Sequence, residues 1–435
     1  MLRFGTDGVR GDAATQLTSE FVVALARAFV RTTGAQRVLI ARDPRESGPR
    51  IEGDLAAGCA AEGIDCESAG VLPTPGLAVL SRERDEWAAM ISASHNRWSD
   101  NGIKFFAPGG TKLSDAHQSG IEAQLATVDG VVPKVAPSLT SIDAASVYEA
   151  WLLDQVGGAD LSGLRVVLDC ANGAASSVAP TVFARLGAAV DVMHAHPNGR
   201  NINDRCGSTY PESLQQRVVD QRADFGLAFD GDADRVLAVD AAGELVDGDQ
   251  IMAIMALAMR DVDELDHDAI AITVMSNLGL RQCLAARGIG FVETPVGDRH
   301  VVAAMERNGL ALGGEQSGHI IFGRRARTGD GTLTGLLLAE RVAASGQELA
   351  TLASVMTRLP QVLHNVRVDG ATTVAGRSDV EAVIAEVAAE LGSEGRVLVR
   401  ASGTEPLVRV MVEAPTTERA EGAALRIVDA VSAPV

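Results

Sequence analysis

Three aspartates at alternate positions form the most chemically distinctive pattern in the chain. Asp230, Asp232 and Asp234 lie in the segment DGDADR, between two apolar runs. If this loop curls, the carboxylates converge on one hard cation, and their oxygens suit Mg²⁺ or Ca²⁺. An EF-hand fits poorly, because Arg235 stands where that loop needs glycine and Ala241 where it needs glutamate. The alternative is an acidic turn in a hairpin, but the apolar surroundings favour a metal site.

A small polar loop follows the apolar stretch that ends at Ile91. The segment 92–96 (SASHN) is typical of a tight turn at the end of a strand, which would expose a hydroxyl. Ser94 could then act as a nucleophile or carry a phosphoryl group. Alternatively, these polar residues only cap a helix or make side-chain turns. A nucleophile elbow is not supported, because the chain has no GxSxG motif.

Two later loops have the composition expected for binding a phosphorylated sugar. In segment 313–319 (GGEQSGH), polar side chains offer donors and acceptors for hydroxyls, and the glycines allow close backbone approach. In segment 400–406 (RASGTEP), two hydroxyls and neighbouring arginines could cradle a phosphate. This is not a Walker A loop, since GxxxxGK[ST] is absent. The alternatives are an irregular loop and a solvated turn with surface arginines.

The charge balance means that an anionic substrate needs local positive sites. The formal net charge is −19, which argues against nucleic acid or an anionic membrane as the main partner. Only three lysines occur, at positions 104, 112 and 134, so arginine supplies most of the positive charge. The segment 4–11 (FGTDGVRG) could also approach an anion, unless it is only a flexible N-terminal turn.

Buried strands followed by turns and helices predict an α/β fold. Continuous β-branched runs between helical segments indicate sheets covered on both faces. The predicted strands are 38–41, 166–168 and 270–274. A helix is predicted after each strand: the first covers 48–62, the second ends at 186 and the third ends at 287. We expect a linker over 131–141, a turn-rich break over 243–249, and a smaller α+β pattern in the last 70 or so residues.

The cysteines and the apolar runs indicate a cytoplasmic protein. Five cysteines without CxxC spacing favour reduced thiols, with neither a disulfide framework nor a zinc site expected. The longest apolar run, 251–259, is far too short to span a bilayer. The N-terminal residues show no signal-peptide pattern.

Taken in order, these loops resemble the α-D-phosphohexomutase superfamily. Between residues 4 and 413 the chain reads FGTDGVRG, ISASHN, DNGIKFF, DGDADR, GGEQSGH and RASGTEPLVRVMVE, so the resemblance covers nearly the whole sequence. It implies four domains around a central cleft, three related α/β units and a smaller C-terminal α+β unit, in a homodimer. We place their boundaries at 1–150, 151–249, 250–364 and 365–435.

The resemblance also implies a role for each matching residue. Ser94 would carry the phosphoryl group as phosphoserine and would hold Mg²⁺ together with Asp230, Asp232 and Asp234. Further catalytic positions would be His95, Lys104, Arg235 and His319. Substrate would be bound by Thr6, Arg10, Glu315, Ser317, Arg400, Ser402, Gly403, Thr404 and Arg409. One departure is Arg97, where the family commonly has proline; we expect an exposed arginine there.

Within the superfamily, FGTDGVRG and GEQSGH are most similar to the members that act on glucosamine phosphates. The implied reaction passes the phosphoryl group of the serine to O1 of glucosamine 6-phosphate. The 1,6-bisphosphate then reorients and returns its 6-phosphoryl group, leaving glucosamine 1-phosphate for UDP-N-acetylglucosamine and cell-wall precursor synthesis. Glucosamine 1,6-bisphosphate or glucose 1,6-bisphosphate would prime the serine.

The residues leave the general base and the substrate open. Lys104, Arg235 and His319 are candidates for the base, and Lys104 stands out because an ammonium can lose its proton whereas a guanidinium effectively cannot. The alternative for Lys104 is an ordinary surface lysine. Other functions to consider are a mutase for glucose or mannose phosphates, a non-catalytic sugar-phosphate binder, and a Mg²⁺-dependent phosphatase.

Overall fold

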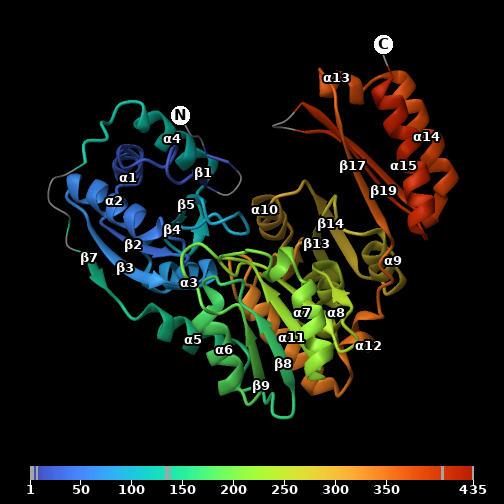
Figure 1. The fold of residues 1–435 in the computed structure, drawn as a ribbon, viewed down its shortest axis with the longest axis horizontal. Coiled ribbons are helices and arrows are strands. Elements are labelled where there is room, and N and C mark those ends of the chain that lie inside the picture. The colour runs from blue at the N-terminus through green and yellow to red at the C-terminus, as the bar shows by residue number, and fades with distance from the viewer. Residues whose placement is uncertain (1–3, 6–7, 133–136, 138, 403–405, 434–435) are drawn as a thin grey trace. The chain divides into compact units, whose positions relative to one another are not determined.

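The computed structural model describes residues 4–5, 8–132, 137, 139–402 and 406–433. The chain divides into two compact units, each described here by itself (Figure 1). The larger unit comprises residues 1–274 and 290–354, and the smaller unit comprises residues 275–289 and 355–435. The larger unit contains three sheets and the smaller unit contains one.

The first sheet of the larger unit has the order β1-β5-β4-β2-β3-β7, with β6 paired to β5. Its strands are β1 (Val9–Asp12), β2 (Arg37–Arg42), β3 (Asp65–Val71), β4 (Trp87–Ile91), β5 (Asp100–Ala107), β6 (Thr111–Lys112) and β7 (Leu139–Ser141). The accompanying helices are α1 (Ser19–Thr33), α2 (Gly48–Ala61), α3 (Thr74–Arg84), α4 (Asp115–Leu125) and α5 (Ala144–Gln155). The strand predicted at 38–41 and the helix predicted at 48–62 are confirmed. The linker predicted over 131–141 is partly wrong, because β7 pairs in parallel with β3.

Both faces of this sheet are buried, as the continuous apolar run of β2 predicts. Val38 and Ile40 join one core with α1, α2 and α4, while Leu39 between them is equally buried on the opposite side. Helices α1 and α2 approach closely at Gly58, where a Cβ would lie only 2.6 Å from the Cβ of Ala26. The packed sheet therefore gives its strand ends fixed positions.

The second sheet has the order β12-β11-β10-β8-β9. Its strands are β8 (Arg165–Asp169), β9 (Ala189–Met193), β10 (Phe225–Phe229), β11 (Val236–Asp240) and β12 (Leu245–Val246). Its helical segments are α6 (Ala175–Arg185), η1 (Gly207–Thr209), α7 (Glu212–Gln221) and α8 (Gly248–Asp261). Strands β10 and β11 form a hairpin, whose loop carries the three aspartates. The break predicted over 243–249 is interrupted by β12, and a capping box between Asp247 and Gln250 starts α8 at Gly248.

The third sheet has the order β14-β13-β15-β16. Its strands are β13 (Ala269–Thr273), β14 (Gly290–Thr294), β15 (Leu312–Gly314) and β16 (Ile320–Phe322). The helical segments in this part of the chain are η2 (Asp266–Asp268), α10 (Asp298–Asn308), α11 (Gly331–Ser345) and α12 (Leu349–Ala353). Helix α10 packs against the third sheet, whereas α11 packs against β10 and β11 of the second sheet. Strand β13 confirms the prediction at 270–274. No helix in the described part of the chain has the length and apolar character that crossing a membrane requires.

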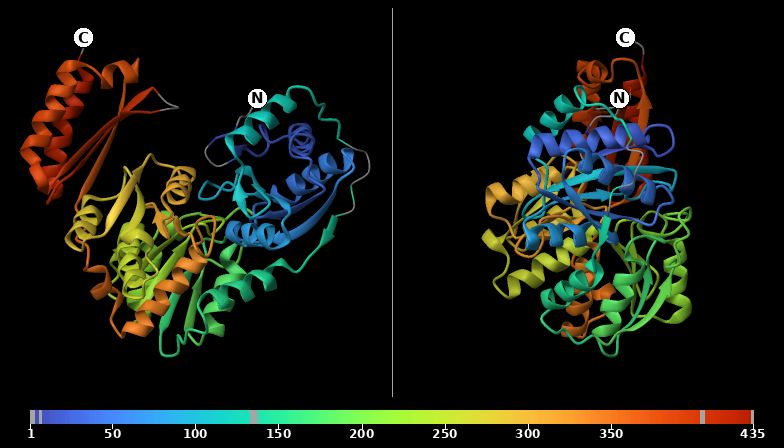
Figure 2. Two further views of the ribbon diagram at one scale, coloured as in Figure 1. Left: turned by 180° about the vertical axis from the view of Figure 1, so that it is seen from behind. Right: turned by 90° about the vertical axis from the view of Figure 1, so that its left-hand side faces the viewer.

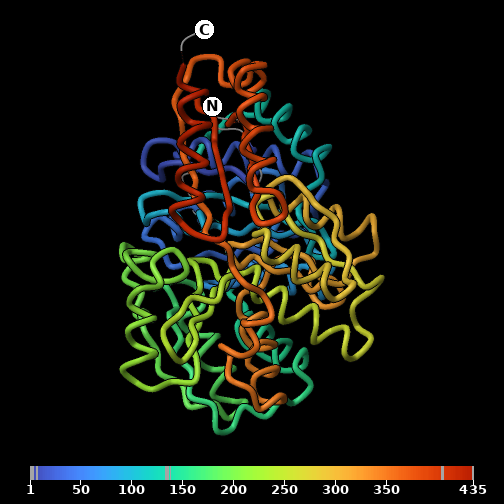
Figure 3. Tube along the Cα trace, turned by 90° about the vertical axis from the view of Figure 1, so that its right-hand side faces the viewer, coloured from blue at the N-terminus to red at the C-terminus, as the bar shows by residue number. Residues whose placement is uncertain are grey.

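The smaller unit is built on an antiparallel sheet of order β17-β19-β18. Its elements are α9 (Leu278–Ala286), β17 (Gln361–Arg367), α13 (Ala371–Ala375), α14 (Ser378–Leu391), η3 (Gly392–Glu394), β18 (Arg396–Ala401), β19 (Leu407–Glu413) and α15 (Thr417–Ser432). Helices α14 and α15 run side by side (Figures 2 and 3) and bury the alternate valines of β19. The α+β prediction for this region is confirmed, although the short helix α13 was not foreseen.

Candidate functional site

The serine loop and the aspartate loop meet inside the larger unit. Ser94 lies just beyond the end of β4, and Asp230 follows the last residue of β10. The Ser94 hydroxyl donates a hydrogen bond of 2.6 Å to Oδ2 of Asp230. The two side chains come from positions 136 residues apart, and both are almost fully buried. Ligand sites in α/β proteins commonly form at such carboxyl ends of strands.

The backbone at Ser94 is held in an unusual conformation. Its φ is +52°, in the left-handed region that non-glycine residues rarely adopt. The Ser94 N–H donates to the hydroxyl oxygen of Ser92 (2.9 Å), and the Ser92 hydroxyl in turn donates to Asp43 (2.7 Å). Strain of this kind persists where the surroundings fix the backbone, and it is concentrated at functional sites.

Two side chains that the sequence did not single out clamp this loop. The guanidinium of Arg45, which is fully buried, donates to the carbonyl oxygens of Ser94 (2.8 Å) and Asn96 (2.9 Å). The amide of Asn203 donates to the same two carbonyls, at 2.9 and 3.0 Å. The only local signal was the Asp43-Pro44 turn before Arg45, because sequence does not reveal that an arginine is buried.

Arg45 also balances a buried charge. Its Nε donates to Oδ2 of Asp43 at 2.9 Å, and both side chains have no exposed surface. Burial raises the pKa of Asp43, while the Arg45 charge opposes that increase. The ion pair therefore helps to hold Arg45, and with it the serine loop, in position.

The aspartate loop is curled, as the metal interpretation requires. One carboxylate oxygen from each of Asp230, Asp232 and Asp234 lies within 4.8 Å of the others. Ala233 has φ +56°, and a Cβ on Gly231 would lie 2.6 Å from the carbonyl oxygen of Ser94. The segment is thus a hairpin loop, but its tight curvature brings the three acidic side chains together.

The three carboxylates repel one another strongly. Burial, then the charges of Asp234 and Asp232, raise the pKa of Asp230 well above its usual value. Burial also opposes ionisation of Asp234, but Lys104 and His319 outweigh it and hold the pKa of Asp234 below its usual range. Additional positive charge nearby would therefore stabilise the ionised cluster.

A divalent cation fits this donor set. Oδ1 of Asp232 and Oδ1 of Asp234 are buried, and neither has a hydrogen-bond partner in the described structure. Buried carboxylate oxygens without partners are costly. All the protein donors are hard oxygen atoms, which suit Mg²⁺.

Cationic side chains border the aspartate loop. Lys104 is buried on β5, with Nζ 2.8 Å from Oδ2 of Asp232 and 3.6 Å from Oδ2 of Asp234. The alternative of a surface lysine is therefore wrong. Arg235 is also close, with Nε 3.8 Å from Oδ1 of Asp234.

Two histidines lie close to the serine and aspartate loops. His319 is buried, with Nδ1 3.6 Å from Oδ1 of Asp234, and its Nε2 accepts a hydrogen bond from the Gly329 N–H (3.1 Å). Nδ1 of His95 lies 3.3 Å from the Ser94 hydroxyl oxygen. Burial, followed by the charges of Arg235 and Arg10, lowers the pKa of His95 to about 4.

A cavity of about 370 Å³ opens beside these groups. Residues from five separate sequence segments line it, including Arg10, His95, Asp234, Arg235, Glu315 and His319. Oε1 of Glu315 accepts a hydrogen bond from the Gly297 N–H at 2.9 Å. Ser317 is not among the lining residues, and its hydroxyl oxygen is buried without a hydrogen-bond partner in the described structure.

The predicted phosphate loop belongs to the smaller unit. Arg400 on β18 and Arg409 on β19 are direct partners in the antiparallel register. Burial and the charge of Arg409 lower the pKa of Arg400. Like charges placed opposite each other on a sheet are unfavourable, so this pair favours a bound anion. The backbone N–H of Ser402 donates to Leu407 (2.9 Å).

Not every predicted residue can be placed. Thr6, Gly403 and Thr404 lie outside the described residues. Arg97 stands where proline is common in the superfamily. Its side chain is 76% exposed, and its Nε lies 3.5 Å from Oδ1 of Asp100. The expectation of an exposed arginine is confirmed.

Comparison with known proteins identifies the family. Four phosphoglucomutase/phosphomannomutase domain descriptions match in order: α/β/α domain I over residues 1–131, domain II over 152–243, domain III over 247–359 and the C-terminal domain over 363–430. The chain belongs to the phosphoglucomutase/phosphomannomutase family. The predicted fold class, three α/β domains and a smaller C-terminal domain, is confirmed.

Individual members of this phosphohexomutase family resemble the chain along its whole length. It is 49% identical to the phosphoglucosamine mutase of Mycolicibacterium paratuberculosis over 439 residues, covering 99% of both chains. The phosphoglucosamine mutase of Streptomyces griseus is also 49% identical, with 98% of both chains covered.

Solved structures in the same family share the fold. A putative phosphomannomutase from Thermus thermophilus has a TM-score of 0.80 at 24% identity, covering 98% of this chain and 99% of that one. The Aspergillus fumigatus N-acetylphosphoglucosamine mutase, solved with GlcNAc-6P and magnesium, has a TM-score of 0.72 at 18% identity, covering 99% and 95%.

The substitution Arg45→Met tests the buried clamp. It leaves the Asp43 carboxylate buried without its ion-pair partner, so we expect a loss of about 3–5 kcal/mol of stability. The matched control is Arg217→Met, which breaks a similar but more exposed pair with Asp191 and should cost about 1 kcal/mol or less. Denaturant unfolding of both variants measures the difference, and equal losses would contradict the role of Arg45.

Proposed function

We propose that the protein interconverts glucosamine 6-phosphate and glucosamine 1-phosphate through a phosphoserine at Ser94 and a 1,6-bisphosphate. The observation that carries this proposal is the 2.6 Å contact between the Ser94 hydroxyl and one of three converging aspartates. Relatives named phosphoglucosamine mutase, 49% identical along nearly the whole chain, support the choice of aminosugar. A non-catalytic binder would need neither a buried serine nor the acidic cluster.

The buried loop positions Ser94 as donor and acceptor of the phosphoryl group. Phosphoryl transfer depends mostly on placement and charge stabilisation. Arg45 and Asn203 fix the backbone of the serine loop, while Asp230 accepts the hydroxyl hydrogen bond and orients Oγ. Asp230, Asp232, Asp234 and Ser94 would hold Mg²⁺, which supplies charge neutralisation for the phosphoryl oxygens when bound.

Other residues serve the sugar and its transferring group. Lys104 and Arg235 add positive charge beside the aspartate loop. Glu315 lines the cavity, and with Ser317 it would bind sugar hydroxyls in either orientation of the substrate. The proton of the attacking sugar hydroxyl passes to Lys104, Arg235 or His319, of which arginine is least suited because its guanidinium stays protonated.

The arginine pair of the smaller unit would hold the phosphate that does not react. Arg400, Ser402 and Arg409, together with Gly403 and Thr404, would make charge-assisted contacts that tolerate either end of the sugar. Thr6 and Arg10 would also contribute to substrate binding.

We also propose the domain boundaries 1–150, 151–249, 250–364 and 365–435, a homodimer and a cytoplasmic location. A 1,6-bisphosphate would prime Ser94, and the related A. fumigatus enzyme, 18% identical, has been solved with glucose 1,6-bisphosphate.

Replacing the serine tests the central step. We expect Ser94→Ala to abolish interconversion of the two glucosamine phosphates, because the variant lacks the hydroxyl that would carry the phosphoryl group. Intact-mass measurement with phosphosite mapping, before and after incubation with a hexosamine bisphosphate, should find the added phosphate only at Ser94. The control Ser99→Ala removes a nearby hydroxyl without a hydrogen-bond partner in the described structure and should keep full turnover. Full activity of Ser94→Ala would refute the phosphoserine, and release of inorganic phosphate would indicate a phosphatase.

Metal removal tests the aspartate loop. EDTA should inactivate the enzyme, and added Mg²⁺ should restore turnover. The reason is that the cation held by the three carboxylates would neutralise the charge of the phosphoryl oxygens. Undiminished turnover in chelator would contradict this metal assignment.

Comparing kcat/KM for glucosamine, glucose and mannose phosphates decides between the proposed substrate and the other sugars of the family.

The arginine pair makes a separate prediction. Arg400→Ala or Arg409→Ala should raise KM for the sugar phosphate while phosphorylation of Ser94 changes less, because each guanidinium contributes to ground-state binding of the distant phosphate. Arg426→Ala, which removes an exposed arginine paired with Glu390 in the same unit, is the control and should leave KM unchanged. A KM unaltered in both test variants would contradict the phosphate cradle.

A further inference from the structure

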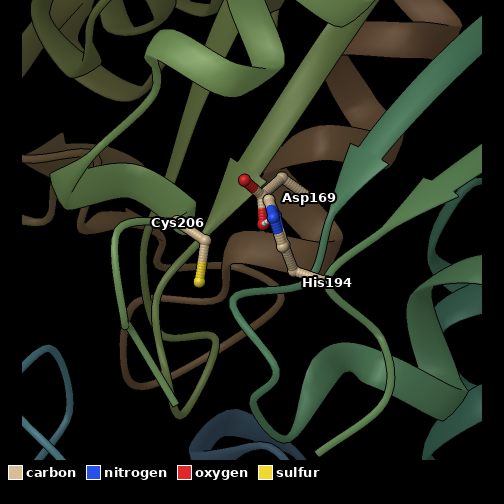
Figure 4. Close-up of side chains that lie close together, drawn as sticks. All are labelled: Asp169, His194 and Cys206. Atoms are coloured by element: carbon tan, nitrogen blue, oxygen red, sulfur yellow. Dashed lines mark ion pairs between the residues drawn. The ribbon is translucent and has the colours of Figure 1, made fainter. Parts of the chain in front are cut away.

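A second cluster of ligating side chains lies at the carboxyl edge of the second sheet (Figure 4). Asp169 ends β8, His194 directly follows the neighbouring parallel strand β9, and Cys206 precedes η1. A carboxylate oxygen, an imidazole nitrogen and a sulfur from these residues all lie within 4.8 Å of one another. The proposed phosphoryl transfer uses none of the three.

The backbone fixes the carboxylate at the centre of this cluster. Asp169 Oδ1 accepts from the Ala171 N–H and Oδ2 accepts from the Gly207 N–H, both at 2.9 Å. Oδ2 keeps a second lone pair, and donors of this kind orient metal-binding carboxylates in other proteins. The carboxylate is therefore both preorganised and still able to bind an ion.

The histidine directs a ring nitrogen toward the carboxylate of the cluster. Nδ1 of His194 lies 3.1 Å from Oδ1 of Asp169, at ion-pair distance, and it is buried. The His194 side chain as a whole is 31% exposed, so one edge of the cluster is open to solvent. That open edge provides an entry path for an ion.

We propose that Asp169, His194 and Cys206 form a second metal site, for a borderline ion of the Zn²⁺ class. Carboxylate, imidazole and thiolate are all established Zn²⁺ ligands, and three protein ligands leave a fourth tetrahedral position for water. Mg²⁺ does not suit this set, because it prefers oxygen donors alone. The two metal sites thus differ in chemistry.

Two simpler roles account for less of the arrangement. An Asp–His pair that only stabilises the loop does not need the sulfur of Cys206. A reactive thiol is disfavoured, because the Cys206 side chain is fully buried, whereas reactive cysteines are partly exposed.

An ion here would brace the segments that support the serine loop. The Asn203 N–H donates to the Ala171 carbonyl at 2.9 Å, and the Asn203 side chain holds the Ser94 carbonyl. Gly207 packs so tightly that a Cβ would lie 2.3 Å from the carbonyl oxygen of Phe229, the residue before Asp230. The proposed ion therefore has a structural role, and it binds the folded chain in preference to the unfolded one.

Cobalt provides a direct probe of the site. With Mg²⁺ in excess, titration of the full-length protein with Co²⁺ should produce a sulfur-to-cobalt charge-transfer band that saturates at one ion per chain. Zn²⁺ should then displace the Co²⁺ and abolish the band. The aspartate loop contains no sulfur, so Co²⁺ bound there cannot give this signal. A wild-type protein without the band overturns the proposal.

Matched variants assign the band to these residues. Cys206→Ser nearly keeps the volume of the side chain, and His194→Asn suits the local φ of +46°. Loss of an outer-shell partner alone weakens metal binding about 10–100-fold, so each variant should weaken Co²⁺ binding by about 100-fold or more. Cys283→Ser, which changes a buried cysteine on α9, should bind Co²⁺ as the wild type does.

Thermal unfolding supplies a second readout. Zn²⁺ should raise the Tm of the wild type and of Cys283→Ser, because a ligand of the folded state stabilises it by mass action, but not the Tm of Cys206→Ser or His194→Asn. An unchanged charge-transfer band in Cys206→Ser, or an equal rise in Tm in all four proteins, overturns the proposal. Neither readout measures turnover, so both are independent of the proposed sugar-phosphate reaction.

Discussion

The mutual repulsion of three buried carboxylates is the constraint that organises the active-site side of this molecule. Asp230, Asp232 and Asp234 are almost without exposed surface, so water cannot screen their charges. Lys104 offsets part of that charge, while two carboxylate oxygens still lack a hydrogen-bond partner in the described structure. A bound cation would stabilise such a cluster, and the proposed phosphoryl transfer from Ser94 would use that same cation.

A buried cluster of this kind is useful only if the serine is held firmly against it. The left-handed backbone at Ser94 would relax if its carbonyl were free, but Arg45 and Asn203 both donate to that oxygen. Arg45 can lie in the core because Asp43 pairs with its guanidinium. The aspartate loop, Ser94 and the side chains of Arg45 and Asn203 thus form one connected hydrogen-bond network across two sheets of the larger unit.

The distribution of positive charge follows from the acidity of the whole chain. At a net charge of −19, long-range attraction does not bring an anionic substrate to the enzyme. Local arginines would therefore have to provide binding, and Arg400 and Arg409 lie opposite each other in the smaller unit, where we propose that they do so. Guanidinium groups suit this task because they stay charged and bind phosphate oxygens through two donors at once.

The sequence by itself determined the class of the fold and predicted a chemistry for the loops, because both depend on local patterns. Continuous apolar runs such as 38–41 have to be covered on both faces, and alternate aspartates in a tight loop have few uses besides metal binding. Only the tertiary structure decided which side chains are buried and which meet. It placed Ser94 on Asp230 and Lys104 among the carboxylates, and it identified Arg45 as the support. It also brought Cys206 to Asp169 and His194, where cysteine spacing alone had predicted no site for zinc. Such contacts join residues far apart in the chain, and they arise from sheet register and packing, which no local pattern encodes.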